Sequence, residues 1–397
     1  MNQNTQPAID LINQQLQEKL AYDDADTPLH IGIDGNEANV SNRVGSNVYT
    51  FQLLTALSQL DSAHRFTIYL KHPPLQDMPP ATDTWQYKVI PFPRLWSQIK
   101  LPWTIFFSSD KPDIFFAPGH YVSPLLPMPV AISILDLAYL THPDYFNPSD
   151  LRQLTNWTKR SVNKASHIFT ISQNSYHDII KQYQVPSNLI TVTYPGINHQ
   201  QFQFPQLDTD INQVKQTYQL PDDYLLYVGT LQPRKNLVTL IEAFHQINHP
   251  TYKLVIAGKK GWMYEQIFEK VRQLNLKDKI IFTDFVPDEH LAPLMAGARA
   301  LLLISLYEGF GIPVVEAQAV GTPGIVSNIS SLPEIIDQAG YVVDPQNVDD
   351  VAQKIQQIID LPHDKYVQLQ DRALEHAAAF TWSHAAAVTL RQLELMA

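Results

Sequence analysis

Two glutamates, Glu308 and Glu316, stand at the ends of the segment EGFGIPVVE. Between them lies a glycine-rich turn, and the run Val314 to Val320 is expected to form a helix with Pro313 in its first turn. A glycine turn leading into a helix presents unpaired backbone N–H groups and the positive end of the helix dipole, which bind phosphate. Ionised carboxylates on either side can accept hydrogen bonds from hydroxyl groups that flank the phosphate. The segment predicts a site for a phosphate between sugars, as in a nucleotide sugar, although a surface helix with acidic first turns has the same pattern.

A second motif places two basic side chains at the start of a helix. An apolar strand is expected at residues 224–228, and a helix with one apolar face follows at residues 237–244. Arg234 and Lys235 stand where that helix begins. Cations there oppose the helix dipole unless an anion offsets their charge, and a guanidinium beside an ammonium suits a pyrophosphate. A solvated basic pair is the alternative interpretation.

The spacing of strands and helices predicts the fold class. Strands alternate with helices along the whole chain, which is typical of α/β proteins with doubly wound parallel sheets. In the first half we expect strands near His30–Asp34, Phe66–Leu70, Lys88–Pro91, Ile114–Phe116, Val130–Leu135, His167–Ile171 and Thr191–Tyr194. In the second half we expect them near Tyr224–Val228, Lys253–Ala257, Lys279–Thr283, Ala300–Ile304, Gly324–Ser327 and Tyr341–Val343. Two Rossmann-like domains fit these two series.

Four segments of the second half carry a resemblance to a known family. They are GTLQPRKN, KLVIAGKKG, the stretch from Ile280 to Ile335 that contains EGFGIPVVE, and AGYVVDP. Together they resemble the retaining glycosyltransferases of family 4, and a looser likeness extends back to about Leu29. The resemblance implies the GT-B fold, in which two Rossmann-like domains face each other across a cleft and a C-terminal helix crosses back to the first domain. We expect a polar extension at 1–28, an acceptor domain at 29–205, a nucleotide-sugar donor domain at 206–380 and the crossover helix at 381–397.

The resemblance also assigns roles to residues of the donor site. Glu308 and Glu316 match the ends of the family's E-x7-E motif, and Arg234 and Lys235 match its diphosphate-binding pair. The ribose would bind Glu316, while Glu308 would hold the donor sugar's hydroxyls or stabilise charge on the transferring ring. The other members of the expected donor site are Thr230, Gly309, Phe310, Gly45, Ser46, Phe285 and Val286, the last two near the base.

One departure from the family concerns the end of the strand at 130–135. Related enzymes often carry His-Asp where this chain has Leu135 and Asp136, and a leucine cannot contact the donor sugar as that histidine does. His120 is another imidazole at a strand end and could substitute, although an isolated loop histidine is often structural. We therefore expect Glu308, His120 and Asp136 as the catalytic candidates.

The first domain offers a loop that leads from Asp34 to a helix opened by Gly45 and Ser46. In the family a glycine here approaches the donor phosphates, whereas an ordinary helix cap is an equally good explanation for Ser46. Loop position alone suggests that Glu37, Asn39 and Arg43 line the acceptor side.

Composition excludes several functional classes. The chain has 397 residues, enough for two domains, and a net charge of −11 argues against a nucleic-acid partner. It has no cysteine, so disulfides and thiolate chemistry are excluded. The N-terminus lacks a signal peptide, and no apolar run could span a bilayer, so a cytoplasmic location is expected. Paired aspartates lie in polar settings, and we predict neither a metal nor a cofactor beyond the nucleotide-sugar substrate.

The segment from Pro91 to Phe107 mixes aromatic and basic side chains. Such a stretch could lie on the inner face of a membrane and give access to a lipid-linked acceptor. Core packing explains the same spacing and is the more common use of such a helix.

The resemblance implies transfer of a hexose from a nucleotide sugar to a glycan, lipid-linked or other acceptor with retention of anomeric configuration and without a metal. Two other interpretations stay open: a non-catalytic nucleotide-sugar-binding subunit, and a GT-B epimerase or phosphorylase. The sequence leaves open the base and sugar of the donor, the acceptor and the oligomeric state.

Overall fold

The computed structural model describes residues 8–20, 27–92 and 95–397, so Arg94 of the aromatic segment lies outside the described residues. Two compact units are formed. Residues 11–196 and 382–397 make the N-terminal unit, and residues 197–381 make the bulk of the C-terminal unit.

The N-terminal unit is built on a seven-stranded parallel sheet of order β3-β2-β1-β4-β5-β6-β7. Its strands are β1 His30–Asp34, β2 Arg65–Leu70, β3 Trp85–Val89, β4 Ile114–Ala117, β5 Val130–Ser133, β6 His167–Thr170 and β7 Ile190–Val192. The central strands are almost wholly buried, as is typical of parallel sheets covered by helices on both faces.

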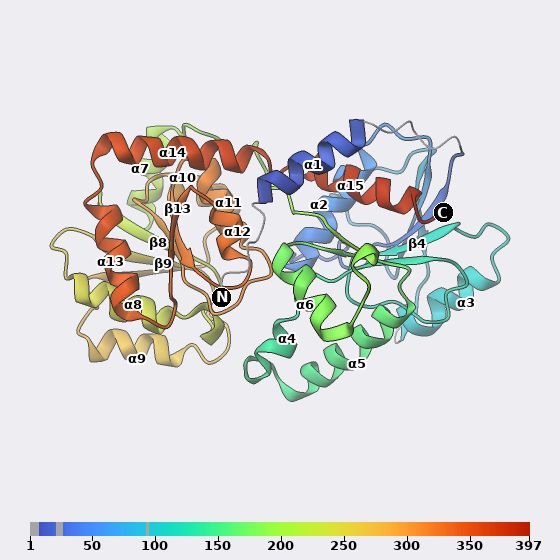
Figure 1. The fold of residues 1–397 in the computed structure, drawn as a ribbon, viewed down its shortest axis with the longest axis horizontal. Coiled ribbons are helices and arrows are strands. Elements are labelled where there is room, and N and C mark those ends of the chain that lie inside the picture. The colour runs from blue at the N-terminus through green and yellow to red at the C-terminus, as the bar shows by residue number, and fades with distance from the viewer. Residues whose placement is uncertain (1–7, 21–26, 93–94) are drawn as a thin grey trace. The chain divides into compact units, whose positions relative to one another are not determined.

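Helices cover both faces of this sheet (Figure 1). They are α1 Ala8–Leu20, α2 Ser46–Ser58, the π-helical turn η1 Trp96–Lys100, α3 Leu101–Phe106, α4 Ala138–Thr141, α5 Pro148–Lys164, α6 Gln173–Tyr183 and α15 Trp382–Glu394, with short 3₁₀ turns at Pro143–Tyr145 and Ser187–Leu189. The last helix, α15, packs on α2, and the ring centroids of Trp382 and Tyr49 lie 5.9 Å apart. The C-terminal end of the chain is therefore an integral part of the N-terminal unit.

The C-terminal unit holds a six-stranded parallel sheet of order β10-β9-β8-β11-β12-β13. The strands are β8 Tyr224–Val228, β9 Lys253–Ala257, β10 Ile280–Asp284, β11 Leu301–Leu303, β12 Gly324–Ser327 and β13 Gly340–Val343. The helices are α7 Asp208–Thr217, α8 Leu237–Ile247, α9 Glu265–Gln273, α10 Asp288–Ala296, α11 Ile312–Ala319, α12 Leu332–Ile336, α13 Val348–Ile359 and α14 His363–Ala378. One layer contains α8, α9 and α13, and another contains α7, α10, α11 and α14 (Figure 1).

The expected fold class is confirmed, because each of the thirteen expected strands is present within a few residues of its expected position. The strand order of each sheet reverses beside its first strand, as in Rossmann-like domains.

The N-terminal extension differs from the expectation that residues 1–28 lie outside the fold. Helix α1 packs into the N-terminal unit, since Ile12 is buried and Gln15 Nε2 donates a hydrogen bond to the carbonyl of Val192 at 2.8 Å. The boundary between the units falls at 196/197, somewhat before the expected 205/206.

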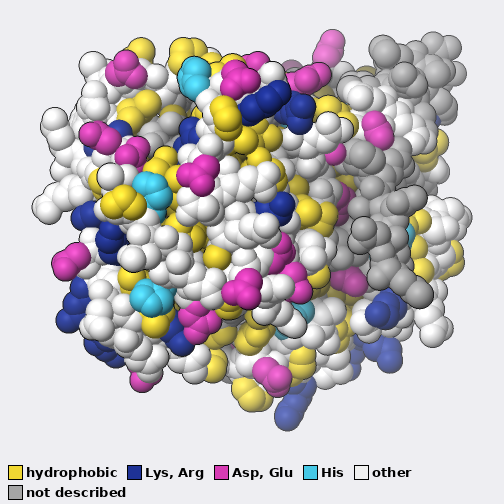
Figure 2. Space-filling view, turned by 60° about the vertical axis from the view of Figure 1, so that its left-hand side comes forward, with side chains coloured by type: hydrophobic (Ala, Val, Ile, Leu, Met, Phe, Trp, Pro, Cys, Tyr) yellow, Lys and Arg dark blue, Asp and Glu magenta, His cyan; other side chains and the backbone are white. Residues whose placement is uncertain are grey.

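Basic and acidic side chains are interspersed on the face seen in Figure 2. Among the residues coloured there, lysine and arginine do not form a continuous basic area.

Candidate donor and acceptor sites

The donor motifs meet at the carboxyl ends of two adjacent strands. In the C-terminal unit β8 pairs with β9 on one side and with β11 on the other, so the strand order reverses at β8. Loops that leave such neighbouring strands on opposite sides open a crevice at the sheet edge, which is where ligands bind in doubly wound folds. Arg234 and Lys235 follow β8, and Glu308 follows β11. The topology thus brings together residues more than seventy positions apart.

The loops at this edge pack backbone against backbone. A Cβ on Gly258, which follows β9, would lie 2.0 Å from the carbonyl oxygen of Gly229, which follows β8. Gly258 also has a φ of +150°, a conformation that other residues rarely adopt. The loop that contains Thr230, an exposed residue, is thereby held close to the segment GKKG.

Glu308 is buried at the centre of an ionic cluster. Lys235 Nζ donates to Glu308 Oε1 at 2.5 Å, and Arg234 Nη1 donates to Oε2 at 3.1 Å. Ser305 Oγ adds a third bond, to Oε1 at 2.6 Å. Arg234 also donates to the carbonyl oxygen of Tyr307. Both basic side chains are thus fixed beside the turn that Glu308 begins.

The charge state of Glu308 follows from this cluster. Its side chain is buried, and burial alone would raise its pKa, but the charges and hydrogen bonds of Lys235 and Arg234 outweigh burial and lower the pKa to about 2. Glu308 is therefore ionised at neutral pH. Because three donors occupy its oxygens, the observed contacts make it a positioning residue for the basic pair, with hydrogen-bonding capacity left mainly on Oε2.

The glycine turn leads into α11 as expected. Gly311 caps the helix with a φ of +112°, and Pro313 lies in the first turn. Phe310 is buried and its ring packs against Phe380 at a centroid distance of 5.7 Å, so its side chain anchors the turn and only its backbone can face a ligand. Within the described chain, no atom accepts a hydrogen bond from the N–H of Gly309.

Glu316 lies one turn into α11 and differs from Glu308 in its burial, its hydrogen-bond partners and the direction of its pKa shift. It is only partly buried, and none of the described residues hydrogen-bonds to its carboxyl group. Burial, and to a smaller extent the charge of Asp288, raises the pKa of Glu316 to about 8. A carboxyl group left without donors in a desolvated setting is suited to accept them from a ligand.

The expected base-binding residues follow β10. Phe285 is 55% exposed, and Lys259 Nζ lies 4.3 Å from its ring centroid, whereas Val286 is buried. Asp288 starts α10, which packs against α11, the helix that carries Glu316. Phe285 and Glu316 thus belong to one region of the C-terminal unit, with Val286 beneath it in the core.

A cavity of about 480 Å³ opens at the corresponding edge of the N-terminal unit. It lies where the strand order reverses at β1, between the loops that follow β1 and β4. Its polar walls include Asp34, Glu37, Lys71 and His120, and its aromatic walls are formed by Trp96, Tyr121 and Trp157. The rings of Tyr121 and Trp157 meet edge to face at 5.3 Å. Aromatic faces beside carboxylates and an ammonium suit a sugar, which presents both C–H faces and hydroxyl groups.

His120 and Asp136 are brought together by the neighbouring strands β4 and β5. His120 lines the cavity, its Nδ1 is buried without a partner in the described chain, and burial lowers its pKa while the charge of Asp136 opposes the shift. Asp136 Oδ1 accepts the N–H of Ala138, the first residue of α4. Leu135 is buried and does not line the cavity. The imidazole at this edge is therefore His120.

Only some residues of the loop after β1 line the cavity. Gly45 is the cap of α2 with a φ of +53°, and Ser46, the first helical residue, donates to Glu37 Oε2 at 3.4 Å. Ser46 is thus not the cap of the helix, and it lines the cavity together with Glu37. Arg43 instead pairs with Asp77 and stacks on Phe51 at 3.7 Å.

Asn39 also stays away from the cavity. It donates to the carbonyl oxygens of His72 and Pro73 and accepts the N–H of Leu75. Of the three residues suggested for the acceptor side, only Glu37 lines the cavity, because the side chains of Arg43 and Asn39 tie the loop to the segment after β2.

Comparisons with known proteins show the family to which the chain belongs. A family model described as "Glycosyl transferases group 1" matches residues 208–376, and one described as "Glycosyltransferase Family 4" matches residues 44–201. O-antigen chain mannosyltransferase B of Escherichia coli is 31% identical over 291 residues, which are 72% of this chain and 75% of that protein. The chain belongs to glycosyltransferase family 4. It is a glycosyltransferase with the GT-B fold.

Two further proteins place this family 4 enzyme among its relatives. O-antigen chain mannosyltransferase RfbU of Salmonella typhimurium strain LT2 is 30% identical over 243 residues, 61% of this chain and 64% of that protein. The structure of Anabaena Alr3699/HepE in complex with UDP and glucose superposes with a TM-score of 0.71 at 18% identity, covering 92% of this chain and 99% of that one. That second likeness establishes the fold.

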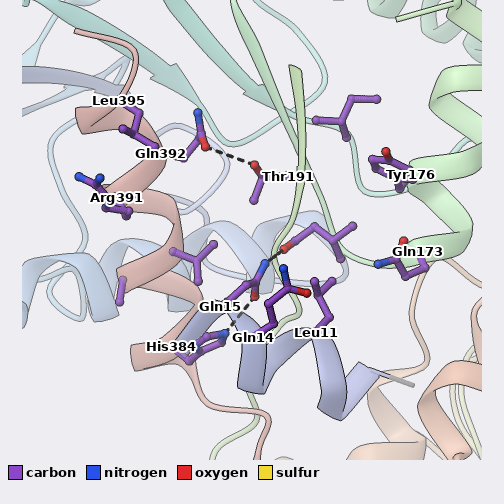
Figure 3. Close-up of a pocket in the computed structure, with 14 residues that line it drawn as sticks. Leu11, Gln14, Gln15, Gln173, Tyr176, Thr191, His384, Arg391, Gln392 and Leu395 are labelled. Carbon is purple, nitrogen blue, oxygen red and sulfur yellow. Dashed lines mark hydrogen bonds between the residues drawn. The ribbon is translucent and has the colours of Figure 1, made fainter. Parts of the chain in front are cut away.

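A second cavity, of about 520 Å³, lies elsewhere in the N-terminal unit of this glycosyltransferase (Figure 3). It is enclosed by α1, α6, β7 and α15, and amide side chains dominate its polar wall, among them Gln14, Gln15, Gln173 and Gln392. His384 Nε2 and Gln15 Oε1 are 3.1 Å apart across it. None of the residues expected for the donor or for catalysis lines this cavity.

Sequence reasoning missed three serines that hydrogen-bond to Glu308, the first glutamate of the motif. Ser305 donates to the carboxylate of Glu308, Ser330 Oγ accepts the N–H of Glu308, and Ser331 Oγ bonds the carbonyls of Glu308 and Phe310. Their positions at strand ends near the motif were the available signal.

No cluster of three or more potential metal ligands occurs among residues 8–20, 27–92 and 95–397. Over those same ranges, no helix combines the length and apolar character needed to cross a bilayer.

Proposed function

We propose that this glycosyltransferase moves a hexose from a nucleoside-diphosphate sugar to a carbohydrate or lipid-linked acceptor with retention of configuration at the anomeric carbon. The observation that carries the proposal is the basic pair Arg234 and Lys235, held by Glu308 beside the glycine turn that starts α11. Mannose is the first sugar to test, because both sequence relatives described above are mannosyltransferases. Nucleotide recognition is supported by the UDP bound in the fold relative.

In this proposal the diphosphate of the donor replaces Glu308 as the main counter-ion of Arg234 and Lys235. The exposed face of Phe285 and the unpaired carboxyl group of Glu316 take the base and the ribose hydroxyls. Thr230 and the N–H of Gly309 border the diphosphate, and Gly45 and Ser46 are further donor-binding residues of the proposal. Positioning and fixed charges then supply the catalysis.

The transfer step breaks the bond between the anomeric carbon and the diphosphate oxygen and forms a bond to the acceptor hydroxyl on the same face. The acceptor proton passes to the departing diphosphate oxygen, and Arg234 and Lys235 neutralise the negative charge that the diphosphate gains. His120, neutral at pH 7 because burial lowers its pKa, hydrogen-bonds to the transferring sugar with Asp136 behind it. The basic pair takes the part that a divalent metal has in other transferases, so EDTA leaves the rate unchanged.

The acceptor binds in the cavity of the N-terminal unit, where Tyr121 and Trp157 offer ring faces and Glu37 an acceptor for hydroxyl groups. A cytoplasmic location completes the proposal.

The experiment is incubation of the purified protein with GDP-mannose, UDP-glucose and UDP-N-acetylglucosamine, each with a panel of acceptor sugars, followed by proton NMR of the anomeric signals. One donor is expected to be consumed, and the product is expected to keep the donor's anomeric configuration. Arg234→Ala should abolish turnover, whereas Lys270→Ala, which removes a surface ion pair of the same unit, should not. Nucleotide binding without turnover on any acceptor would instead favour a non-catalytic subunit.

A further inference from the structure

The segment η1–α3 exposes an apolar ridge made of Leu95, Ile99, Trp103, Phe106 and Phe107. Their side chains are between 49% and 66% exposed, although each is large and hydrophobic. The opposite side of the same segment is buried, with Leu101 and Ile105 fully inside the core of the N-terminal unit. Core packing therefore explains only half of the apolar residues of this segment, and the ridge needs another explanation.

Three side chains of the ridge form a connected aromatic surface. The ring of Phe107 contacts those of Trp103 and Phe106 at centroid distances of 5.0 and 5.2 Å. Among the described residues, six of the eighteen exposed large hydrophobic side chains lie within residues 92–107, with Phe92 as the sixth. Exposed apolar patches of this kind usually mark a binding surface.

The ridge is bordered by positive charge in a protein that is otherwise acidic. Residues 88–111 contain four basic residues and one acidic residue, Asp110, whereas the whole chain has a net charge of −11. Asp110 is neutralised locally, because Arg65 forms two hydrogen bonds to it at 2.5 and 2.6 Å. Lys111 lies over the ring of Phe106 at 5.3 Å, and Lys100 lies 5.9 Å from the ring of Phe92. An aromatic surface with ammonium groups at its margin is complementary to an anionic lipid bilayer, in which apolar chains lie beneath a negatively charged surface.

The inner side of the same segment forms a wall of the acceptor cavity. Leu95, Trp96, Ser97 and Gln98 line that cavity, so Leu95 belongs to both surfaces. Ser123 Oγ donates to the carbonyl of Gln98 at 2.9 Å and ties the segment to the loop that follows β4. One short segment thus carries the ridge on its outside and a cavity wall on its inside.

We infer that the apolar ridge docks on the surface of an anionic lipid bilayer and that the acceptor is a sugar attached to a membrane lipid. Tryptophan and phenylalanine side chains enter the interfacial region, while Lys100 and Lys111 stay at the level of the lipid phosphates. Docking places the cavity mouth next to the bilayer, where the sugar of such a lipid is presented while its hydrocarbon stays in the membrane. The acceptor part of this inference rests on the proposed function, and the docking part does not.

The test is flotation of the full chain with vesicles of phosphatidylcholine, with and without phosphatidylglycerol. The wild type should float with the anionic vesicles and less with the neutral ones. The double variant W103S/F107S should lose at least about tenfold in bound fraction. The matched control is L207S/W262S, which removes a tryptophan and a second large apolar residue of similar exposure from the C-terminal unit and should float as the wild type does. K100Q/K111Q should bind anionic vesicles more weakly and with a smaller dependence on salt.

Several results would overturn the inference. The wild type could stay at the bottom of the gradient with every vesicle, or W103S/F107S could float as well as the wild type. A third contrary result combines two observations: the wild type does not float, and it forms a dimer in analytical ultracentrifugation that is absent in W103S/F107S. The ridge would then bind a second copy of the chain. Transfer assays separate this inference from the proposed function: W103S/F107S should slow transfer to a lipid-linked acceptor in vesicles and leave transfer to a water-soluble acceptor unchanged. Absence of all transfer with flotation intact contradicts the proposed function alone.

Discussion

Glu308→Gln should destabilise the protein most when no nucleotide is present. The pKa of Glu308 falls from an ordinary 4.5 to about 2, which corresponds to about 3 kcal/mol in favour of the ionised form. Replacement by glutamine removes the carboxylate that Lys235 and Arg234 contact, and losing one partner of a buried pair costs about 3–5 kcal/mol. We therefore expect the free energy of unfolding to drop by about 3 kcal/mol, measured by urea denaturation followed by circular dichroism.

The same variant has a distinctive pH and ligand response. A depressed carboxyl pKa stabilises the folded state above the unfolded pKa, so the wild type should lose this stabilisation as the pH falls from about 4.5 towards 2, and the two proteins should converge in acid. Nucleoside diphosphate should bind Glu308→Gln at least as tightly as the wild type, because its phosphates replace the lost carboxylate, while transfer is slowed. The control is Glu242→Gln, which breaks a partly exposed ion pair with Lys270 and should cost no more than about 1 kcal/mol. A Glu308→Gln variant no less stable than Glu242→Gln would refute the reasoning.

Three further predictions concern single side chains. The raised pKa of Glu316 leaves it mostly protonated at neutral pH, so nucleotide affinity measured by calorimetry should increase as the pH is raised towards about 8, by up to about tenfold per pH unit. Glu316→Gln should bind nucleotide more weakly and without this pH dependence, and a Glu316→Gln variant whose affinity still depends on pH in this way would contradict the assignment. His120→Ala should lower kcat about 100-fold and leave the nucleotide affinity from calorimetry unchanged; an unchanged kcat removes His120 from the catalytic set. Gly258→Ala should lower the free energy of unfolding by about 2–3 kcal/mol, because its Cβ would overlap a carbonyl oxygen, whereas Gly45→Ala, with open space around its Cβ, should cost about 1 kcal/mol; equal costs in urea titrations would contradict this.

The sheets were predictable because parallel strands read as short apolar runs between turn residues. Strands β1, β8, β9 and β12 begin and end at the expected residues, and the others differ by a few positions at their ends. The apolar stripe at 237–244 is buried as expected. These features depend on local sequence alone, since a strand with helices on both sides is mostly apolar along its length.

Contacts between distant residues were beyond sequence reasoning. The expected donor residues fall at strand ends, but the bonds from Lys235 and Arg234 to Glu308 depend on β8 and β11 being neighbours, a property of strand order. The sequence also did not determine which side of the segment η1–α3 faces the core. Apolar residues occupy both sides of η1–α3, so spacing could not tell that Trp96 turns inward and Trp103 outward.

The extension was misjudged for a related reason. Helix α1 is mostly polar, and a few contacts, such as the burial of Ile12 and the bond from Gln15 to Val192, decide that it packs on the N-terminal unit. A surface helix held by so few residues has no strong apolar stripe for a sequence to reveal.

The most direct measurement is a crystal structure of the protein with GDP or UDP bound. The account predicts that the diphosphate contacts Arg234 and Lys235 beside Gly309, with the ribose hydroxyls within hydrogen-bond distance of Glu316. A nucleotide bound away from the basic pair, or one that leaves the carboxyl group of Glu316 facing solvent, would contradict it.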